Sequence, residues 1–323
     1  MSATPQSSVL ARWIASAPPP AALEIDARRV TAVSITGQGA SRVLSGHATE
    51  PLPAGAVDAA LNAPNVHDQG AVARAIRAAV DTLSPRPRRV ALVLPDTVAK
   101  VSLLRFDKIP PKPQDLEQLI RWQILKAVPF KIEEAQLSWF PGVALPEGGR
   151  EYVVMAARRD IIASYERACD AAGVHAGIVD VTTLNLVNAV IASKAPAGDW
   201  LLVHVAADYA TIAVVRGHAL IFFRNRAMDA DEDLAALVHQ TAMYHEDRLE
   251  GGGFSRVVLG GASSRGAETA DRIRRSLEER LGVGVEPLDF RAAVSLRDRI
   301  SVAPELVDTL APAIGVILRE QVA

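Results

Sequence analysis

The sequence predicts a two-lobed α/β protein whose halves share one design. Two stretches have the same pattern, an apolar strand, a polar turn and a second, alternating strand: EIDARRVTAV, which begins at Glu24, and HVAADYATIAV, which begins at His204. Thr31 and Thr211 also hold equivalent places, and both pairs are 180 residues apart. Elsewhere short strands alternate with helices, which is typical of a mixed sheet covered by helices. A length of 323 residues favours two domains over one.

Composition excludes several classes of protein. Apolar residues make up 49% and charged residues 22% of the chain, as in ordinary globular proteins. A formal charge of −2 gives no general attraction to nucleic acid, so no nucleic-acid partner is expected. The single cysteine, Cys169, excludes an internal disulfide and a cysteine-built metal site. No apolar run approaches the ~20 residues that span a bilayer, and the start lacks the features of a signal peptide. We therefore expect an intracellular protein.

The chain is expected to begin with a disordered tail over residues 1–20, which is rich in Ser, Ala and Pro. Within it, Val9, Leu10, Trp13 and Ile14 would share one face of a short helix. That face could contact a membrane or a partner, or have no function, because strong interfacial helices are longer and more basic.

The first lobe is expected over residues 21–195. Alternating residues within 23–52 predict a hairpin or meander, and an apolar stripe over 69–83 predicts a helix. The continuous apolar run at 89–94 predicts a buried strand, and 100–106 predicts another. Pro129 should end a helix over 114–128. The remaining strands are expected at 135–143, 151–157 and 176–181, and the remaining helices at 160–172 and from 182 to about 194.

The second lobe is expected over residues 196–323. Three strands are predicted near 200–205, 211–216 and 219–224, and a long helix over 231–249 that a run of three glycines ends. A strand at 256–259 then leads through Gly260 and Gly261 into a helix that reaches residue 281. A final helix over 304–320 closes the chain and is expected to pack back toward the first lobe.

The middle of the first lobe resembles the PilM family of actin-like type IV pilus assembly proteins, which share their fold with FtsA and the GspL cytoplasmic domain. The resemblance lies in LPDTVAKVSLLRFDKIP and in QDLEQLIRWQILKAVPFKIEEAQLSW. Its signature is a helix that ends in Pro129 and Phe130, followed by Glu133 and Glu134.

This resemblance implies a fold of the actin, heat-shock-protein and sugar-kinase superfamily, with nucleotide between the lobes and a small subdomain inserted at about 111–158 in the first lobe. The second lobe is expected to be reduced relative to the family. It also implies a position at the cytoplasmic face of the inner membrane. There the protein would bind the N-terminal cytoplasmic peptide of a single-pass, PilN-like partner, and other assembly proteins, in a pilus or a type II secretion-like machine.

The sequence departs from the family at the nucleotide site. Glu24 stands where the family has an aspartate that places magnesium, and Asp26 stands where it has a phosphate-turn glycine. In the second turn His204 and Ala206 replace another aspartate and glycine. A carboxylate in place of a glycine repels phosphate unless a cation intervenes.

The adenosine side is only partly retained. Gly260, Gly261 and Ala262 match the family's adenosine turn, although such a turn is common in other proteins. Only the six residues 225–230 stand where the family usually has a helical subdomain. We therefore predict a pseudo-ATPase scaffold with no catalytic residue and no cofactor; the alternative is an assembly protein that binds ATP and Mg and hydrolyses ATP weakly.

Aromatic residues suggest where a partner binds. Trp122, Phe130 and Trp139 would either fill the core of the small subdomain or anchor a partner peptide in a groove. No metal site is expected, because His239 and His245 would lie on different faces of one helix and serve solvated or capping roles.

Overall fold

The computed structural model describes residues 18–145, 148–194, 197–228, 234–296 and 303–321. Most of the predicted tail, including its four apolar residues, lies outside these ranges. Among the described helices, none combines the length and the apolar character needed to cross a membrane.

The first lobe is built on a six-stranded sheet with the order β14-β3-β2-β1-β4-β8. Its strands are β1 (Ala21–Ile25), β2 (Arg29–Thr36), β3 (Val43–Pro51), β4 (Arg89–Leu94), β8 (His175–Val181) and β14 (Ser295–Leu296). Helices α2 (Gln69–Asp81) and α4 (Arg159–Ala171) cover one face. Leu23 and Ile25 point toward these helices, whereas Ala22 packs in the cluster on the other face, as strand alternation requires. Glu24 therefore shares the Ala22 face, which looks toward the second lobe.

The second lobe is built on a five-stranded sheet with the order β11-β10-β9-β12-β13. Its strands are β9 (Asp199–Val205), β10 (Tyr209–Arg216), β11 (Ala219–Ala227), β12 (Arg256–Gly260) and β13 (Val285–Pro287). Helices α6 (Leu234–Arg248) and α7 (Ala267–Leu281) cover its outer face.

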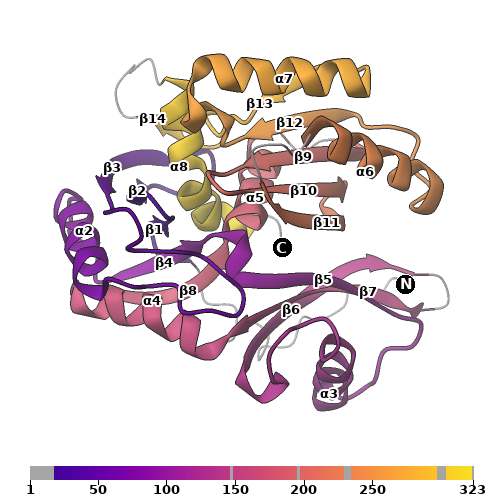
Figure 1. Ribbon diagram of the computed structural model, residues 1–323, viewed down its shortest axis with the longest axis horizontal. Coiled ribbons are helices and arrows are strands. Elements are labelled where there is room, and N and C mark those ends of the chain that lie inside the picture. The colour runs from indigo at the N-terminus through magenta and orange to yellow at the C-terminus, as the bar shows by residue number, and fades with distance from the viewer. Residues whose placement is uncertain (1–17, 146–147, 195–196, 229–233, 297–302, 322–323) are drawn as a thin grey trace, which may run out of the picture.

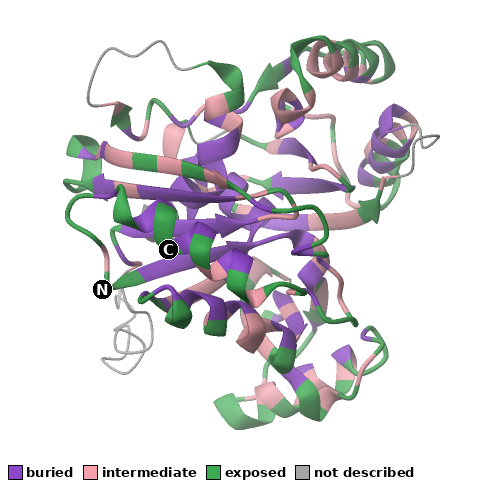
Figure 2. Cartoon of the chain, turned by 60° about the vertical axis from the view of Figure 1, so that its left-hand side comes forward, coloured by how far each residue is buried: buried purple, intermediate pink, exposed green. Residues whose placement is uncertain are grey.

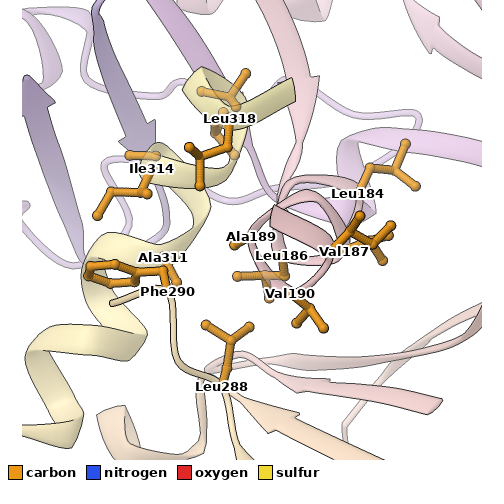
Figure 3. Packing of buried hydrophobic residues seen from close by; sticks show 14 of the residues in the cluster. Leu184, Leu186, Val187, Ala189, Val190, Leu288, Phe290, Ala311, Ile314 and Leu318 are labelled. Atoms are coloured by element: carbon orange, nitrogen blue, oxygen red, sulfur yellow. The ribbon is translucent and has the colours of Figure 1, made fainter. Parts of the chain in front are cut away.

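Two apolar helices, α5 (Thr182–Ser193) and α8 (Pro304–Ile317), lie between the sheets and belong to one core cluster with both of them. Figure 3 shows α5 and α8 beside each other, with Leu186 and Ala189 on the side of α5 toward α8 and Val190 directed toward Leu288. The helices approach so closely that a Cβ added at Gly315 would lie 1.9 Å from the Asn185 carbonyl oxygen. In Figure 2 the strands of the two sheets are mostly buried, and the helices on the outside of the molecule carry the exposed residues.

A third sheet, with the order β5-β7-β6, forms a separate layer. It consists of β5 (Ala99–Phe106), β6 (Ala135–Ala144) and β7 (Arg150–Arg158), with α3 (Pro113–Ile124) on its outer face (Figure 1). Because β5 pairs with β7 along its whole length, this layer begins at Ala99, before the expected boundary at 111. Helix α3 ends at Ile124, earlier than the expected residue 128, and residues 125–127 continue as a turn. Pro129 has no N–H group to donate to the Leu125 carbonyl, so the helical hydrogen-bond pattern cannot continue to it.

Candidate functional site

The two repeated hairpins meet in the cleft between the lobes. Glu24 lies directly opposite Thr31 in the β1–β2 pair, and His204 lies directly opposite Thr211 in the β9–β10 pair. The predicted internal equivalence therefore holds at the level of strand register. Both turns line one cleft, whose space open to water-sized molecules is about 70 Å³. Binding pockets for small molecules generally have volumes of about 300–1,000 Å³, so the cleft is smaller than such a pocket.

The first turn is closed by its own carboxylate. One oxygen of Asp26 accepts hydrogen bonds from the backbone N–H groups of Arg28, at 2.6 Å, and Arg29, at 2.9 Å. The other oxygen lies 3.3 Å from the Arg29 side chain. Backbone N–H groups of this kind hold phosphate in nucleotide-binding turns. Here Asp26 takes the position of the anion.

Glu24 lies beneath this turn and is 7% exposed. Burial and, after it, the nearby charge of Asp26 raise the pKa of its carboxyl group from 4.5 to about 8, against the lowering effect of Arg29. With no cation beside it, Glu24 is therefore largely neutral near pH 7.

The second turn is closed by backbone and by an arginine. The Ala206 N–H group donates to the Tyr209 carbonyl at 2.9 Å. Arg265 donates two hydrogen bonds to the Ala206 carbonyl, at 3.0 and 2.6 Å, and one to the Ala207 carbonyl at 2.8 Å. Burial raises the pKa of the adjacent Asp208. No backbone donor of Ala206 remains for a ligand.

The turn that matches the family's adenosine turn is also explained by contacts within the chain. Gly261 has a φ of +81°, and a Cβ there would lie 2.4 Å from the Val205 carbonyl oxygen, so only glycine fits. Gly260 ends β12, and Ala262 is buried at the start of a short 3-10 helix (Ala262–Arg265). The Ser263 N–H group of that helix donates to the Asp308 carboxylate at 2.9 Å. Of the six residues named for a degenerate site, Glu24, Asp26, Ala206 and Gly261 line the cleft. Gly260 instead faces Leu186 and Leu288, and Ala262 packs in the core of the second lobe.

Sequence reasoning missed Asp96, which lies beneath the cleft and accepts several hydrogen bonds there. This residue follows β4 and is fully buried, yet it accepts hydrogen bonds from the Thr183 N–H group at 2.9 Å, the Thr183 hydroxyl at 2.5 Å and the Thr211 hydroxyl at 2.7 Å. The available signal was an aspartate directly after a fully apolar strand, at the end where strands β1 and β4 meet the cleft.

The three aromatic residues predicted for partner binding have different environments. Phe130 and Trp139 pack against the core between α3 and the third sheet, whereas Trp122 is 67% exposed on α3. Trp139 faces α3 because the β6 residues on either side of it, Ser138 and Phe140, point to the opposite face of the sheet.

That opposite face of β6 borders an apolar pocket between the third sheet and the first lobe. Gln136 and Ser138 of β6, Met155 of β7 and Val179 of β8 lie along it. Among the described strands, β6 pairs only with β7, and β8 pairs only with β4, so each of them is an edge strand. Sequence reasoning did not find this pocket, because its walls come from strands that lie far apart in the chain.

The histidines of α6 do not form a metal site. His245 is not solvated as expected: it is fully buried, its Nε2 lies 2.6 Å from Asp199, and its ring stacks on Phe254. The buried imidazole completes the core at the end of α6. Within the described ranges, no group of three or more His, Cys, Asp or Glu side chains is arranged to hold a metal ion.

Comparison with solved structures gives one strong overlap. A PilM–PilN type IV pilus biogenesis complex superimposes with a TM-score of 0.79 at 20% identity, covering 93% of this chain and 97% of that chain. The cytoplasmic domain of EpsL, from the type II secretion system of Vibrio cholerae, gives a TM-score of 0.45 at 11% identity, with 74% of this chain and 80% of that one covered. An actin-like ATPase-fold protein of unknown function from Bacteroides thetaiotaomicron gives 0.48 at 10% identity, with coverages of 83% and 89%. The latter two scores are too low to carry an argument.

Comparison at the level of sequence identifies the family. No curated protein matches the chain. The family model described as type IV pilus assembly protein PilM matches residues 22–247, which is more than half of the chain. The predicted resemblance and the two-lobed actin-like fold are both confirmed, and the chain belongs to the PilM family of type IV pilus assembly proteins.

Proposed function

We propose that the protein is a scaffold of a type IV pilus assembly complex that works without nucleotide. It would act at the cytoplasmic face of the inner membrane and hold the N-terminal cytoplasmic peptide of a single-pass, PilN-like protein, alongside other assembly proteins. Family membership supports the pilus role, and the overlapping solved structure is a complex of PilM with PilN.

The observation that carries the nucleotide-independent part is the internal closure of the turns. Asp26 takes the donors of the first turn, Tyr209 takes the Ala206 donor of the second, and Asp308 takes a donor of the third. A phosphate would have to displace these partners, and in the first turn it would meet a carboxylate of its own sign. Because the turns already have these partners, the proposal of a nucleotide-independent scaffold is favoured over that of an ATPase.

The pocket between β6 and β8 is the best candidate for the partner peptide. An extended peptide can pair with an exposed strand edge through its backbone while its side chains enter adjacent pockets. Here two such edges border one pocket whose walls include Met155 and Val179. This combination suits a short, extended segment with apolar side chains.

Fluorescence anisotropy with a labelled peptide tests this proposal. The peptide is the N-terminal cytoplasmic segment of a PilN-like single-pass membrane protein. Ser138→Arg places a charged side chain at the pocket and is expected to weaken binding at least tenfold, which corresponds to roughly 1.4 kcal/mol. Because Ser138 is exposed, folding should be unaffected. Ser276→Arg, at an exposed position of α7, is the matched control and should bind as the wild type does.

The same assay separates the pocket from the aromatic surface of α3. Binding that persists in Ser138→Arg but is lost in Trp122→Ala would move the peptide to α3. No binding by the wild-type chain at high concentration would contradict the scaffold role.

A further inference from the structure

The carboxylate of Asp96 lies at the junction of the lobes, and both lobes supply its hydrogen bonds. Asp96 itself belongs to the first lobe, as does Thr183 at the start of α5. Thr211 and Tyr209 belong to β10 of the second lobe: the Thr211 hydroxyl donates to Asp96 at 2.7 Å, and the Asp96 N–H group donates to the Tyr209 hydroxyl at 3.2 Å. The β9–β10 hairpin, which would face a phosphate in a nucleotide-binding relative of this fold, here holds a carboxylate of the opposite lobe.

Donors and acceptors can be assigned in one consistent way to the hydrogen bonds around Asp96. Asn225 donates to the Thr211 hydroxyl oxygen at 2.8 Å, so the Thr211 proton is free to point to Asp96. The Thr183 hydroxyl likewise gives its proton to Asp96. His204 Nδ1 lies 3.2 Å from the Thr183 oxygen and 3.5 Å from Asp96, and with both hydroxyl protons directed to Asp96 it is the donor of its contact with Thr183.

Because the Asp96 carboxylate is shielded from water, its stability in the folded protein depends on these hydrogen-bond donors. Asp96 is fully buried, and hydrogen bonds to a carboxylate are stronger than those between neutral groups. The backbone N–H of Thr183 adds the favourable field of a helix N-terminus. Loss of the Thr211 hydroxyl would leave the charge short of a donor from the second lobe, and separation of the lobes would expose the carboxylate to water.

We propose that Asp96, Thr183, Thr211 and Tyr209 form an interlobe latch, which holds the two lobes in one closed arrangement in the absence of any ligand. Nucleotide closes a two-lobed cleft by bringing an anion to both hairpins; in this chain Asp96 supplies the anion permanently. The latch does not depend on the identity of the partner peptide, and it persists whether or not the peptide binds in the pocket between β6 and β8.

Distance measurements between spin labels test the latch in the full chain. Labels are placed on cysteines introduced at the exposed residues Thr49, in β3, and Glu279, in α7. Cys169 is buried and should stay unlabelled. The otherwise wild-type chain is expected to give one narrow distance distribution that Mg-ATP does not change. Thr211→Val should broaden it and should raise hydrogen exchange of the β9–β10 amides by roughly tenfold or more.

Thr241→Val is the matched control. Thr241 is also fully buried in the second lobe, but its hydroxyl donates to Leu237 within α6, so the interlobe distance should not change. Asp96→Asn, which removes the charge and halves the acceptor capacity, should broaden the distribution as Thr211→Val does. The latch is refuted if Thr211→Val gives the wild-type distribution and exchange, or if the wild type is already broad or shifts with Mg-ATP. Failure of peptide binding would not alter these distances, so the two proposals fail separately.

Discussion

The carboxyl group of Glu24 couples the cleft to pH. Its pKa is about 8 in the folded protein against 4.5 for the ordinary group, so the folded state retains a proton that the unfolded chain releases across this window. The contribution of Glu24 to stability is therefore fully present below pH 4.5 and is lost as pH rises toward 8. Glu24→Gln keeps a neutral side chain at every pH. We expect it to be more stable than the wild type by about 2–4 kcal/mol at pH 8 and nearly equal to it at pH 4.5.

Urea denaturation at several pH values measures this difference. Glu279→Gln, at an exposed position, serves as the control and should follow the wild-type profile. Parallel profiles for Glu24→Gln and the wild type would show that Glu24 is ionised in the folded protein.

At the scale of elements, the packing of α5 against α8 joins the two lobes in one core. Alanine normally stabilises a helix relative to glycine by about 1 kcal/mol. At Gly315, however, the added Cβ would lie 1.9 Å from the Asn185 carbonyl oxygen, so the helices would have to move apart. We expect Gly315→Ala to destabilise the protein by about 1–3 kcal/mol, as overpacked cores do, measured by thermal or urea unfolding.

Gly70→Ala in α2 provides the comparison for that prediction. There the added Cβ would meet only the end of the Arg74 side chain at 3.2 Å and that of Asp68 at 3.4 Å, and both can shift. It should be neutral or slightly stabilising. Equal effects of the two substitutions would show that the α5–α8 contact relaxes easily.

At the scale of the whole molecule, closed turns and a latched cleft predict no response to nucleotide. A ligand that binds only the folded state stabilises it by about 2.7 kcal/mol at 100 times its Kd. We therefore expect millimolar ATP with magnesium to leave the thermal unfolding midpoint unchanged, as measured by calorimetry. A rise of several degrees that requires magnesium would instead favour the ATP-binding alternative.

Sequence patterns predicted what is local and periodic in this fold. The two hairpins and their equivalence follow from alternation and from a spacing of 180 residues, and the structure pairs Glu24 with Thr31 and His204 with Thr211 accordingly. The exposed face of β6 was not predicted, because alternation shows that Ser138 and Trp139 differ in direction but not which of them meets α3. Asp96 was missed because its donors lie 87 and 115 residues away, and no periodicity reports such separations.

The way in which the turns are satisfied also limits what a single substitution can do at the cleft. Each turn has its own local partner: Asp26 accepts from the backbone of the first, Arg265 donates to the carbonyls of the second, and Asp308 accepts from the third. Removing any one of these partners would leave the other two turns as they are. On the proposal that the chain works without nucleotide, opening the cleft to a phosphate would thus take several substitutions made together.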